Sequence, residues 1–311
     1  MQTDLPLTSE PTLPQAAPAV PAGPKGISVG VVVQLAKLRL SLLVVFSGVI
    51  AFALGREGQA TQWEWMAFSV AGLFTTVSAN IVNQILERGP DALMDRTRNR
   101  PLPTGRLDPA PAWALVAVFG VLGMGTYALY FTPLSFALAL ASWLLYGFVY
   151  TPLKRITPLA VAVGAVPGAM PLLIGFAAAT GTVSPEALLM FVVQFLWQFP
   201  HFWSVAWVLA DDYERGGFRL LPGRGGKPDA LTAWLMFFYT LLLFPAVWLP
   251  FLLGYVSLQA GIVCTVASLG FLYTNYKLVR LQTRAAARGV MFGSFLYLPA
   301  VQLAVLLDRL L

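Results

Sequence analysis

The sequence predicts an all-α protein that crosses a membrane nine times. Of its 311 residues, 58% are hydrophobic and only 11% are charged, and apolar runs of about 20 residues recur along most of the chain. Soluble domains carry roughly a quarter charged residues, because polar groups have to cover their exteriors. A chain so poor in charge could not hide its apolar surface in water, so the lipid bilayer is its expected solvent.

The expected spans follow one another from residue 31 to residue 308. Each is close to the length that a helix needs to cross the hydrocarbon core. In chain order they are 31–54, 63–87, 110–131, 134–151, 158–180, 186–210, 231–254, 256–276 and 289–308. Some contain proline, such as Pro167 and Pro171 in the fifth, where we expect kinks because neighbouring helices can satisfy the freed carbonyls.

The basic residues predict how these spans are oriented. Of the 20 Lys and Arg, all but Arg56 and Arg309 fall at the entry to the first span or in the connections after the second, fourth, sixth and eighth. The positive-inside rule therefore places those connections and the N-terminus in the cytoplasm, and the C-terminus outside. Short basic clusters between apolar segments indicate membrane topology, and no nucleic-acid partner is expected.

Residues 1–26 differ from the rest of the chain. They hold six prolines among small and polar residues and lack the apolar region of a signal peptide, so we expect a disordered cytoplasmic tail. Residues 27–311 are expected to form one transmembrane domain. The two longest connections follow the second and sixth spans, which suggests two four-helix halves and one further helix. The single cysteine, Cys264, lies in an apolar run and is interpreted as packing.

A regular series of polar residues ends the second span. Asn83, Glu87 and Asp91 are four residues apart, so a helix places three oxygen-bearing side chains on one face. Mg²⁺ takes such ligands together with substrate phosphates. Gly89-Pro90 is expected to interrupt the helix before Asp91. Arginines whose planar donor forks suit phosphate follow at Arg96, Arg98 and Arg100. A helix end that contacts anionic lipid is the alternative, and the interleaving of acids with arginines argues against it.

Further polar residues are expected at the same membrane face. Asp211 and Asp212 follow the sixth span and could bind a second Mg²⁺, with a plain solvated helix end as the alternative, and Gly216-Gly217 permits a tight turn after them. The fourth span ends with Tyr150 and Lys154, and the first span begins with Lys37 and Arg39, so a phenol and cations are expected at this face. The alternative is that these side chains only anchor the helices by snorkelling to the membrane surface.

These motifs resemble those of the UbiA-type intramembrane prenyltransferase superfamily. Asn83-x₃-Glu87-x₃-Asp91, followed by Arg96-Thr-Arg-Asn-Arg-Pro-Leu-Pro-Thr-Gly105, is similar to its first acidic motif, and Tyr150-x₃-Lys154 to its tyrosine–lysine motif. The chain further resembles one branch of this superfamily, the protoheme IX farnesyltransferases. The resemblance lies at Glu87, at Trp197-Gln198-x-Pro-His201-Phe and at Asp211-Asp212-Tyr213-x-x-Gly216-Gly217. The chain departs from the usual pattern at Gly89-Pro90, at Leu38 and at Arg215, and the missing acid at Gly89 bears on the metal ligands.

The resemblance implies a UbiA-type fold and transfer of the farnesyl group of farnesyl diphosphate to a vinyl group of haem B, giving haem O. It implies Mg²⁺ on Asn83, Glu87, Asp91, Asp211 and Asp212, and diphosphate contacts from Lys37, Arg39, Arg96, Arg98, Arg100, Tyr150 and Lys154. Haem contacts are expected from Trp197, Gln198 and His201, although a structural hydrogen bond would also explain this lone histidine. A bacterial plasma membrane location, a cytoplasmic site and a haem A synthase as a possible partner also follow.

Two other functions stay open. A prenyltransferase that acts on another acceptor, such as a quinone precursor, would use the same diphosphate motifs, and only the haem-like stretches argue against it. A transporter would have its site near the bilayer midplane, between broken helices. Nearly all the acidic residues here are expected at the cytoplasmic end of the spans, which favours an enzyme.

Overall fold

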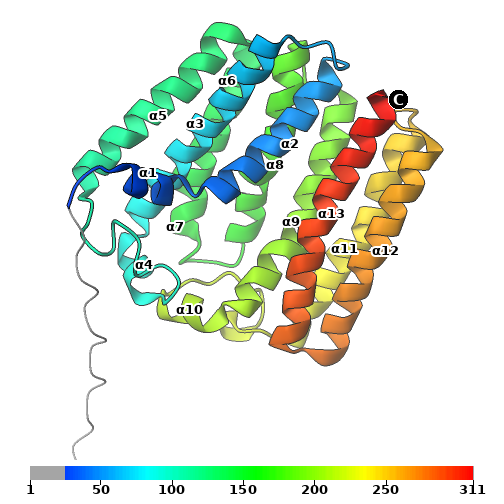
Figure 1. Ribbon diagram of the computed structural model, residues 1–311. Coiled ribbons are helices and arrows are strands. Elements are labelled where there is room, and N and C mark those ends of the chain that lie inside the picture. The colour runs from blue at the N-terminus through cyan, green and yellow to red at the C-terminus, as the bar shows by residue number, and fades with distance from the viewer. Residues whose placement is uncertain (1–24, 311) are drawn as a thin grey trace, which may run out of the picture.

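The computed structural model describes residues 25–310, and Figure 1 shows their arrangement. Within this range no strand occurs, and nine helices are long and apolar enough to cross a membrane. The all-α fold with nine expected spans is therefore confirmed. The tail expected at residues 1–26 lies outside the described residues except for its last two.

The described residues form spans joined by short helices at the membrane faces. The spans are α2 (Leu38–Gly55), α3 (Gln62–Leu86), α5 (Pro109–Tyr130), the continuous α6 (Pro133–Leu144), η1 (Leu145–Tyr150) and α7 (Thr151–Leu153), α8 (Ala160–Thr180), α9 (Pro185–Val208), α11 (Ala230–Leu252), α12 (Leu258–Leu281) and α13 (Arg284–Leu310). The short helices are α1 (Val29–Ala36), α4 (Arg88–Leu93), α10 (Ala210–Arg215) and η2 (Arg224–Gly226). Every expected end lies within five residues of an observed one, except the start of the first span.

The spans gather into two groups that lie side by side in Figure 1. The first contains α2, α3, α5, α6 and α8, and the second contains α9, α11, α12 and α13. Helix α8 packs against both α2 and α9, so it joins the groups, and α13 also contacts α2. Short helices α4 and α10, one from each group, meet at the same end of the bundle. This division agrees with the expected halves of four helices plus one.

The first span does not run unbroken from residue 31, and this prediction was wrong. The backbone of Lys37 is left-handed, with φ 46° and ψ 52°, so α1 ends before it and α2 begins after it. Helix α1 consequently lies across the end of the bundle (Figure 1). A left-handed L residue costs roughly 1–2 kcal/mol, so other contacts have to stabilise the break.

Buried polar side chains supply those contacts. The break frees carbonyl oxygens at the end of α1, and the Ala36 carbonyl accepts a hydrogen bond from Ser41 Oγ at 2.7 Å. The Leu35 carbonyl accepts one from Gln84 Nε2 of α3 at 2.8 Å. Buried backbone groups are nearly always paired, and here the partners include α3, far along the chain.

A carbonyl that a proline leaves free in α8 has a hydrogen-bond partner on a neighbouring helix, as expected. Pro171 has no N–H to donate to the carbonyl of Pro167, one helical turn earlier. That carbonyl accepts a hydrogen bond from Ser142 Oγ of α6 at 3.3 Å. This hydrogen bond ties α8 to α6 of its own group.

Close approach of α2 and α8 depends on a glycine, and its replacement is expected to destabilise the protein. A Cβ atom on Gly175 would lie 2.4 Å from the Gly48 carbonyl oxygen and 2.8 Å from the Ala51 side chain. Because the Gly48 oxygen belongs to the backbone and cannot move aside as a flexible side chain can, we expect Gly175→Ala to lower the free energy of unfolding by ~1–3 kcal/mol. Thermal unfolding in detergent measures this. The control is Gly270→Ala, since a Cβ there meets no atom within 4 Å, and equal melting temperatures for the two variants would contradict the prediction.

Candidate active site

The first acidic motif lies where α3 passes into α4. Asn83 is in the last turn of α3, Glu87 is the junction residue, and Asp91 is in α4. The helix is interrupted before Asp91, as expected, but the break falls at Glu87 and not at Gly89-Pro90. Pro90 lies in the first turn of α4, where a missing N–H costs little. The Asp91 N–H still donates to the Glu87 carbonyl at 2.7 Å. The motif residues therefore keep helical spacing across the junction.

Each motif residue is buried and faces a cation from a different part of the chain. Exposure is 2% for Asn83, 6% for Glu87 and 1% for Asp91. Lys37 Nζ donates to Asn83 Oδ1 at 3.0 Å, Lys154 Nζ forms an ion pair with Glu87, and Arg100 Nη1 donates to Asp91 Oδ2 at 2.7 Å. Since an isolated buried charge is strongly unfavourable, the cations hold this acidic cluster in place.

Lys37 reaches the cluster because of the break between α1 and α2. Burial and then the charge of Arg100 together lower the pKa of its ammonium group to about 7, while Glu87 acts in the opposite direction. Burial and repulsion between like charges thus raise the free energy of the protonated lysine. A bound anion such as a diphosphate would relieve that repulsion.

Lys154 is held between two aromatic rings. Its Nζ lies 4.9 Å from the ring centroid of Tyr150 and 5.3 Å from that of Phe218. Tyr150 ends the π-helical segment η1 and packs against Gly164 of α8, where a Cβ atom would lie 2.6 Å from the ring. The rings and Glu87 together fix the direction of the ammonium group.

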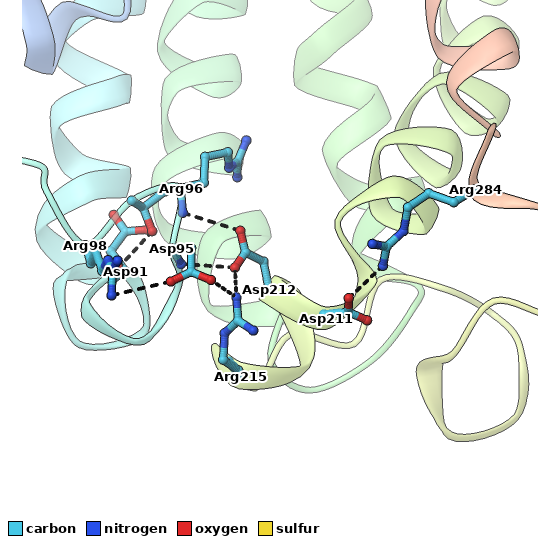
Figure 2. Close-up of polar contacts among 9 residues, drawn as sticks. Asp91, Asp95, Arg96, Arg98, Asp211, Asp212, Arg215 and Arg284 are labelled. Atoms are coloured by element: carbon cyan, nitrogen blue, oxygen red, sulfur yellow. Dashed lines mark hydrogen bonds and ion pairs between the residues drawn. The ribbon is translucent and has the colours of Figure 1, made fainter. Parts of the chain in front are cut away.

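The side chains of the second acidic pair, Asp211 and Asp212, point in different directions (Figure 2). The carboxylate of Asp212 accepts hydrogen bonds from the backbone N–H of Asp95 at 3.0 Å and of Arg96 at 3.4 Å, and it contacts Arg215. Arg215 also donates to Asp95 Oδ2 at 2.6 Å. Burial favours the neutral acid, but these donors outweigh it and keep the pKa of Asp212 below its usual range. Asp212 therefore docks α10 onto the connection that follows the first motif.

Asp211 points away from that connection. Its Oδ2 atom accepts a hydrogen bond from Arg284 Nη2, at the start of α13, at 2.7 Å (Figure 2), and this bond lowers the pKa of Asp211. Asp211 and Glu87 nevertheless line the same cavity of about 1030 Å³, together with Thr151 and Tyr213. Carboxylates from the two connections thus open into one space at the same end of the bundle.

A tight turn brings the second connection over the first group of helices. Gly217 has φ 71°, which a glycine adopts without strain, and the Phe218 N–H donates back to the Tyr213 carbonyl at 2.8 Å. The Arg219 N–H then donates to the Lys154 carbonyl at 2.7 Å. This turn places the Phe218 ring beside the Lys154 ammonium.

The other arginines predicted for the site lie farther from the acidic cluster. Arg96 stands 5.8 Å from the ring centroid of Tyr213, and Arg98 forms an ion pair with Asp95 at 3.5 Å. Arg39 is exposed and has no ion pair with any described residue. Sequence reasoning missed Asp95 and Arg215, which are 120 residues apart, and no local pattern could have paired them.

The residues predicted to contact haem lie in the packing between helices. Trp197 Nε1 donates to the Ser294 carbonyl at 3.0 Å, and Gln198 Nε2 donates to the Ala165 carbonyl at 2.9 Å. His201 stacks on Trp197, and its Nδ1 is 2.8 Å from Ser294 Oγ. None of the three lines the large cavity. Their role toward haem stays a prediction.

The buried oxygen atoms suit a hard divalent cation. Mg²⁺ prefers carboxylate and carbonyl oxygens and shares its coordination with phosphate, and Asn83, Glu87 and Asp91 present such atoms on one face. Among residues 25–310 no three His, Cys, Asp or Glu side chains are close enough to hold a metal ion, so a full set of ligands would include Asn83 and substrate oxygens. The residues present therefore fit Mg²⁺ bound together with a diphosphate.

Within residues 25–310, nine spans and an oxygen-rich, cation-lined site at one end form the arrangement expected of a membrane-embedded prenyltransferase. A model of the UbiA prenyltransferase family matches residues 42–298. The chain belongs to the UbiA prenyltransferase family.

Relatives with curated names support a particular branch of this family. The protoheme IX farnesyltransferase of Cytophaga hutchinsonii is 42% identical over 277 residues, which cover 89% of this chain and 96% of the relative. That of Christiangramia forsetii is 40% identical, with 89% and 92% covered. The mitochondrial protoheme IX farnesyltransferase of Arabidopsis thaliana is 35% identical, with 89% and 64% covered. The resemblance seen in the motifs is thus confirmed.

Solved structures confirm the fold. A digeranylgeranylglyceryl phosphate synthase superposes with a TM-score of 0.76 at 16% identity, covering 91% of this chain and 98% of the other. A UbiA homolog from Archaeoglobus fulgidus bound to DMAPP and Mg²⁺ superposes with a TM-score of 0.65 at 14% identity, covering 88% and 98%. At these identities the likeness concerns the fold alone.

Proposed function

We propose that this prenyltransferase uses Mg²⁺ and transfers the farnesyl group of farnesyl diphosphate to a vinyl group of haem B, forming haem O. The observation that carries the chemistry is the buried face of Asn83, Glu87 and Asp91, with a cation opposite each residue. The choice of donor and acceptor is supported by 42% identity to a protoheme IX farnesyltransferase across nearly its full length.

The cations of the site would stabilise the leaving diphosphate. Asn83, Glu87 and Asp91 would hold Mg²⁺, and the bound ion would supply electrophilic stabilisation for the diphosphate. Lys37, Lys154 and Arg100, which now balance the acids, are placed to donate to phosphate oxygens as the C1–O bond of the farnesyl group breaks. Arg39, Arg96, Arg98 and Tyr150 are proposed as further diphosphate contacts, and Asp211 and Asp212 as further metal ligands.

The allylic cation left by that step needs a dry, aromatic surrounding. Tyr150 and Phe218 already place their rings around the Lys154 ammonium, beside Glu87. Such faces stabilise positive charge and exclude water. Attack by the vinyl group forms the new C–C bond, and water then adds its hydroxyl to the porphyrin-side carbon and releases a proton. No side-chain nucleophile is required.

Haem contacts are proposed for His201, Trp197 and Gln198. Ser294 occupies Nδ1 of His201, so Nε2 is the nitrogen that could ligate iron. The site is proposed to face the cytoplasm of a bacterial cell, since the basic connections lie at its end of the bundle. A haem A synthase that receives the product stays a prediction.

A product assay tests the proposed function. Purified protein given haem B, farnesyl diphosphate and Mg²⁺ is expected to form a haem whose mass has increased by one farnesyl group and one hydroxyl group, and EDTA is expected to stop the reaction. Mass spectrometry of the extracted haem measures both. Unchanged haem beside a prenylated 4-hydroxybenzoate in a parallel reaction would show instead that the acceptor is a quinone precursor.

A further inference from the structure

The two ends of the Asn83 amide contact different partners. Its Oδ1 accepts a hydrogen bond from Lys37 Nζ at 3.0 Å, and its Nδ2 donates to Thr151 Oγ1 at 3.2 Å. An amide turned by 180° has almost the same shape, but only its oxygen carries lone pairs for a cation. The orientation of this amide therefore decides whether Asn83 can serve as a metal ligand.

The hydroxyl of Thr151 permits only one of the two orientations. A hydroxyl has a single proton, and Thr151 Oγ1 donates it to the Tyr146 carbonyl at 2.8 Å. Toward Asn83 it can offer only lone pairs, so the NH₂ end of the amide has to face it. Thr151 is 2% exposed, so bulk water does not compete for this contact.

The π-helical segment η1 explains why the proton goes to Tyr146. The Thr151 N–H also donates to the Tyr146 carbonyl, five residues earlier, which is the hydrogen bond of a π-helix. In the regular helices, threonines such as Thr126, Thr180 and Thr265 donate to the carbonyl four residues earlier, as Thr240 does to Met236 at 2.9 Å. The wider turn of η1 thus places the acceptor that commits the Thr151 proton.

We propose that Thr151 is a positioning residue that holds the Asn83 carbonyl oxygen toward Lys37 and the metal–diphosphate site. With the amide reversed, two donors, the Asn83 NH₂ group and the Lys37 ammonium, would face each other, and no lone pair would point into the site. This inference rests on the proposed function, because it gives Asn83 the role of a ligand. Partners that orient a ligand typically change metal affinity by roughly 10–100-fold when removed.

Direct metal binding tests the proposal separately from turnover. Free Mn²⁺ is measured by electron paramagnetic resonance on solubilised protein with the unreactive analogue farnesyl S-thiolodiphosphate. We expect Thr151→Val to weaken Mn²⁺ binding by about tenfold or more and Thr151→Ser to restore it, while turnover at saturating Mg²⁺ falls less than affinity. The matched control is Thr240→Val, because the hydroxyl of buried Thr240 only donates within its own helix.

A second variant separates orientation from a general loss of structure. In Asn83→Asp the two oxygens are equivalent and need no orienting partner, so adding Thr151→Val is expected to cause no further loss of Mn²⁺ affinity. Equal affinity of Thr151→Val and the unmodified protein, or a full loss in the Asn83→Asp background, would overturn the positioning role. If Asn83→Ala binds Mn²⁺ as tightly as the unmodified protein, the metal role in the proposed function fails instead.

Discussion

Asp91→Asn is expected to reduce farnesyl transfer by roughly a hundredfold or more while the protein remains folded. The substitution keeps the shape of the side chain and removes the charge that faces Arg100 at 2.7 Å. The backbone carbonyl of Asp91, which accepts a hydrogen bond from Thr97 Oγ1 at 2.8 Å, is not altered. The variant therefore loses the charge that we propose as a metal ligand but not the contact that holds the connection after α4.

Initial rates of haem O formation across a Mg²⁺ titration measure this effect, with thermal unfolding to check the fold. The matched control is Asp108→Asn, since Asp108 stands exposed at the start of α5 on the same connection and caps no N–H with its side chain. The control is expected to turn over normally. Near-normal turnover of Asp91→Asn at limiting Mg²⁺ would remove Asp91 from the metal site.

Lys154→Met is expected to lower both activity and stability. The ammonium of Lys154 is the only cation among the described residues that forms an ion pair with Glu87, and both side chains are almost fully buried. Removing one partner of a buried pair leaves the other charge uncompensated, at a cost of ~3–5 kcal/mol. Loss of a cation that we propose contacts the diphosphate is expected to reduce turnover by roughly a hundredfold.

A double variant separates the two effects. Glu87→Gln with Lys154→Met leaves no unpaired charge, so most of the lost stability is expected to return while the enzyme stays inactive. Lys277→Met is the control, because its ammonium lies over the exposed ring of Tyr273, away from the acidic cluster. Full activity in the double variant would show that Lys154 serves only to balance Glu87.

The spans could be predicted from the sequence because length and hydrophobicity are local properties. The break at Lys37 could not be predicted, since it is stabilised by a hydrogen bond from Gln84, which lies on another helix. The position of Pro90 was misread for a related reason. Proline interrupts a helix only where an N–H is needed, and a new helix that begins at Arg88 removes that need.

The candidate site divides in the same way. Regular spacing predicted that Asn83, Glu87 and Asp91 share a face, and in the structure all three are buried and each contacts a cation. Nothing local indicated that Asp211 and Asp212 would turn in different directions, because Arg284 and the backbone of Asp95 attract them from distant segments. The π-helix at η1 was also missed, since its sequence is as apolar as any regular helix.

The contact between Asp212 and the first connection is made to main-chain amides. Every residue except proline carries such an amide, so these two hydrogen bonds survive side-chain changes at positions 95 and 96, whereas the ion pair between Arg215 and Asp95 does not. The carboxylate at 212 has no comparable freedom. The main-chain donors thus tolerate side-chain substitution, whereas Asp212 does not. A proline at position 95 or 96 is the one natural substitution that removes a donor outright.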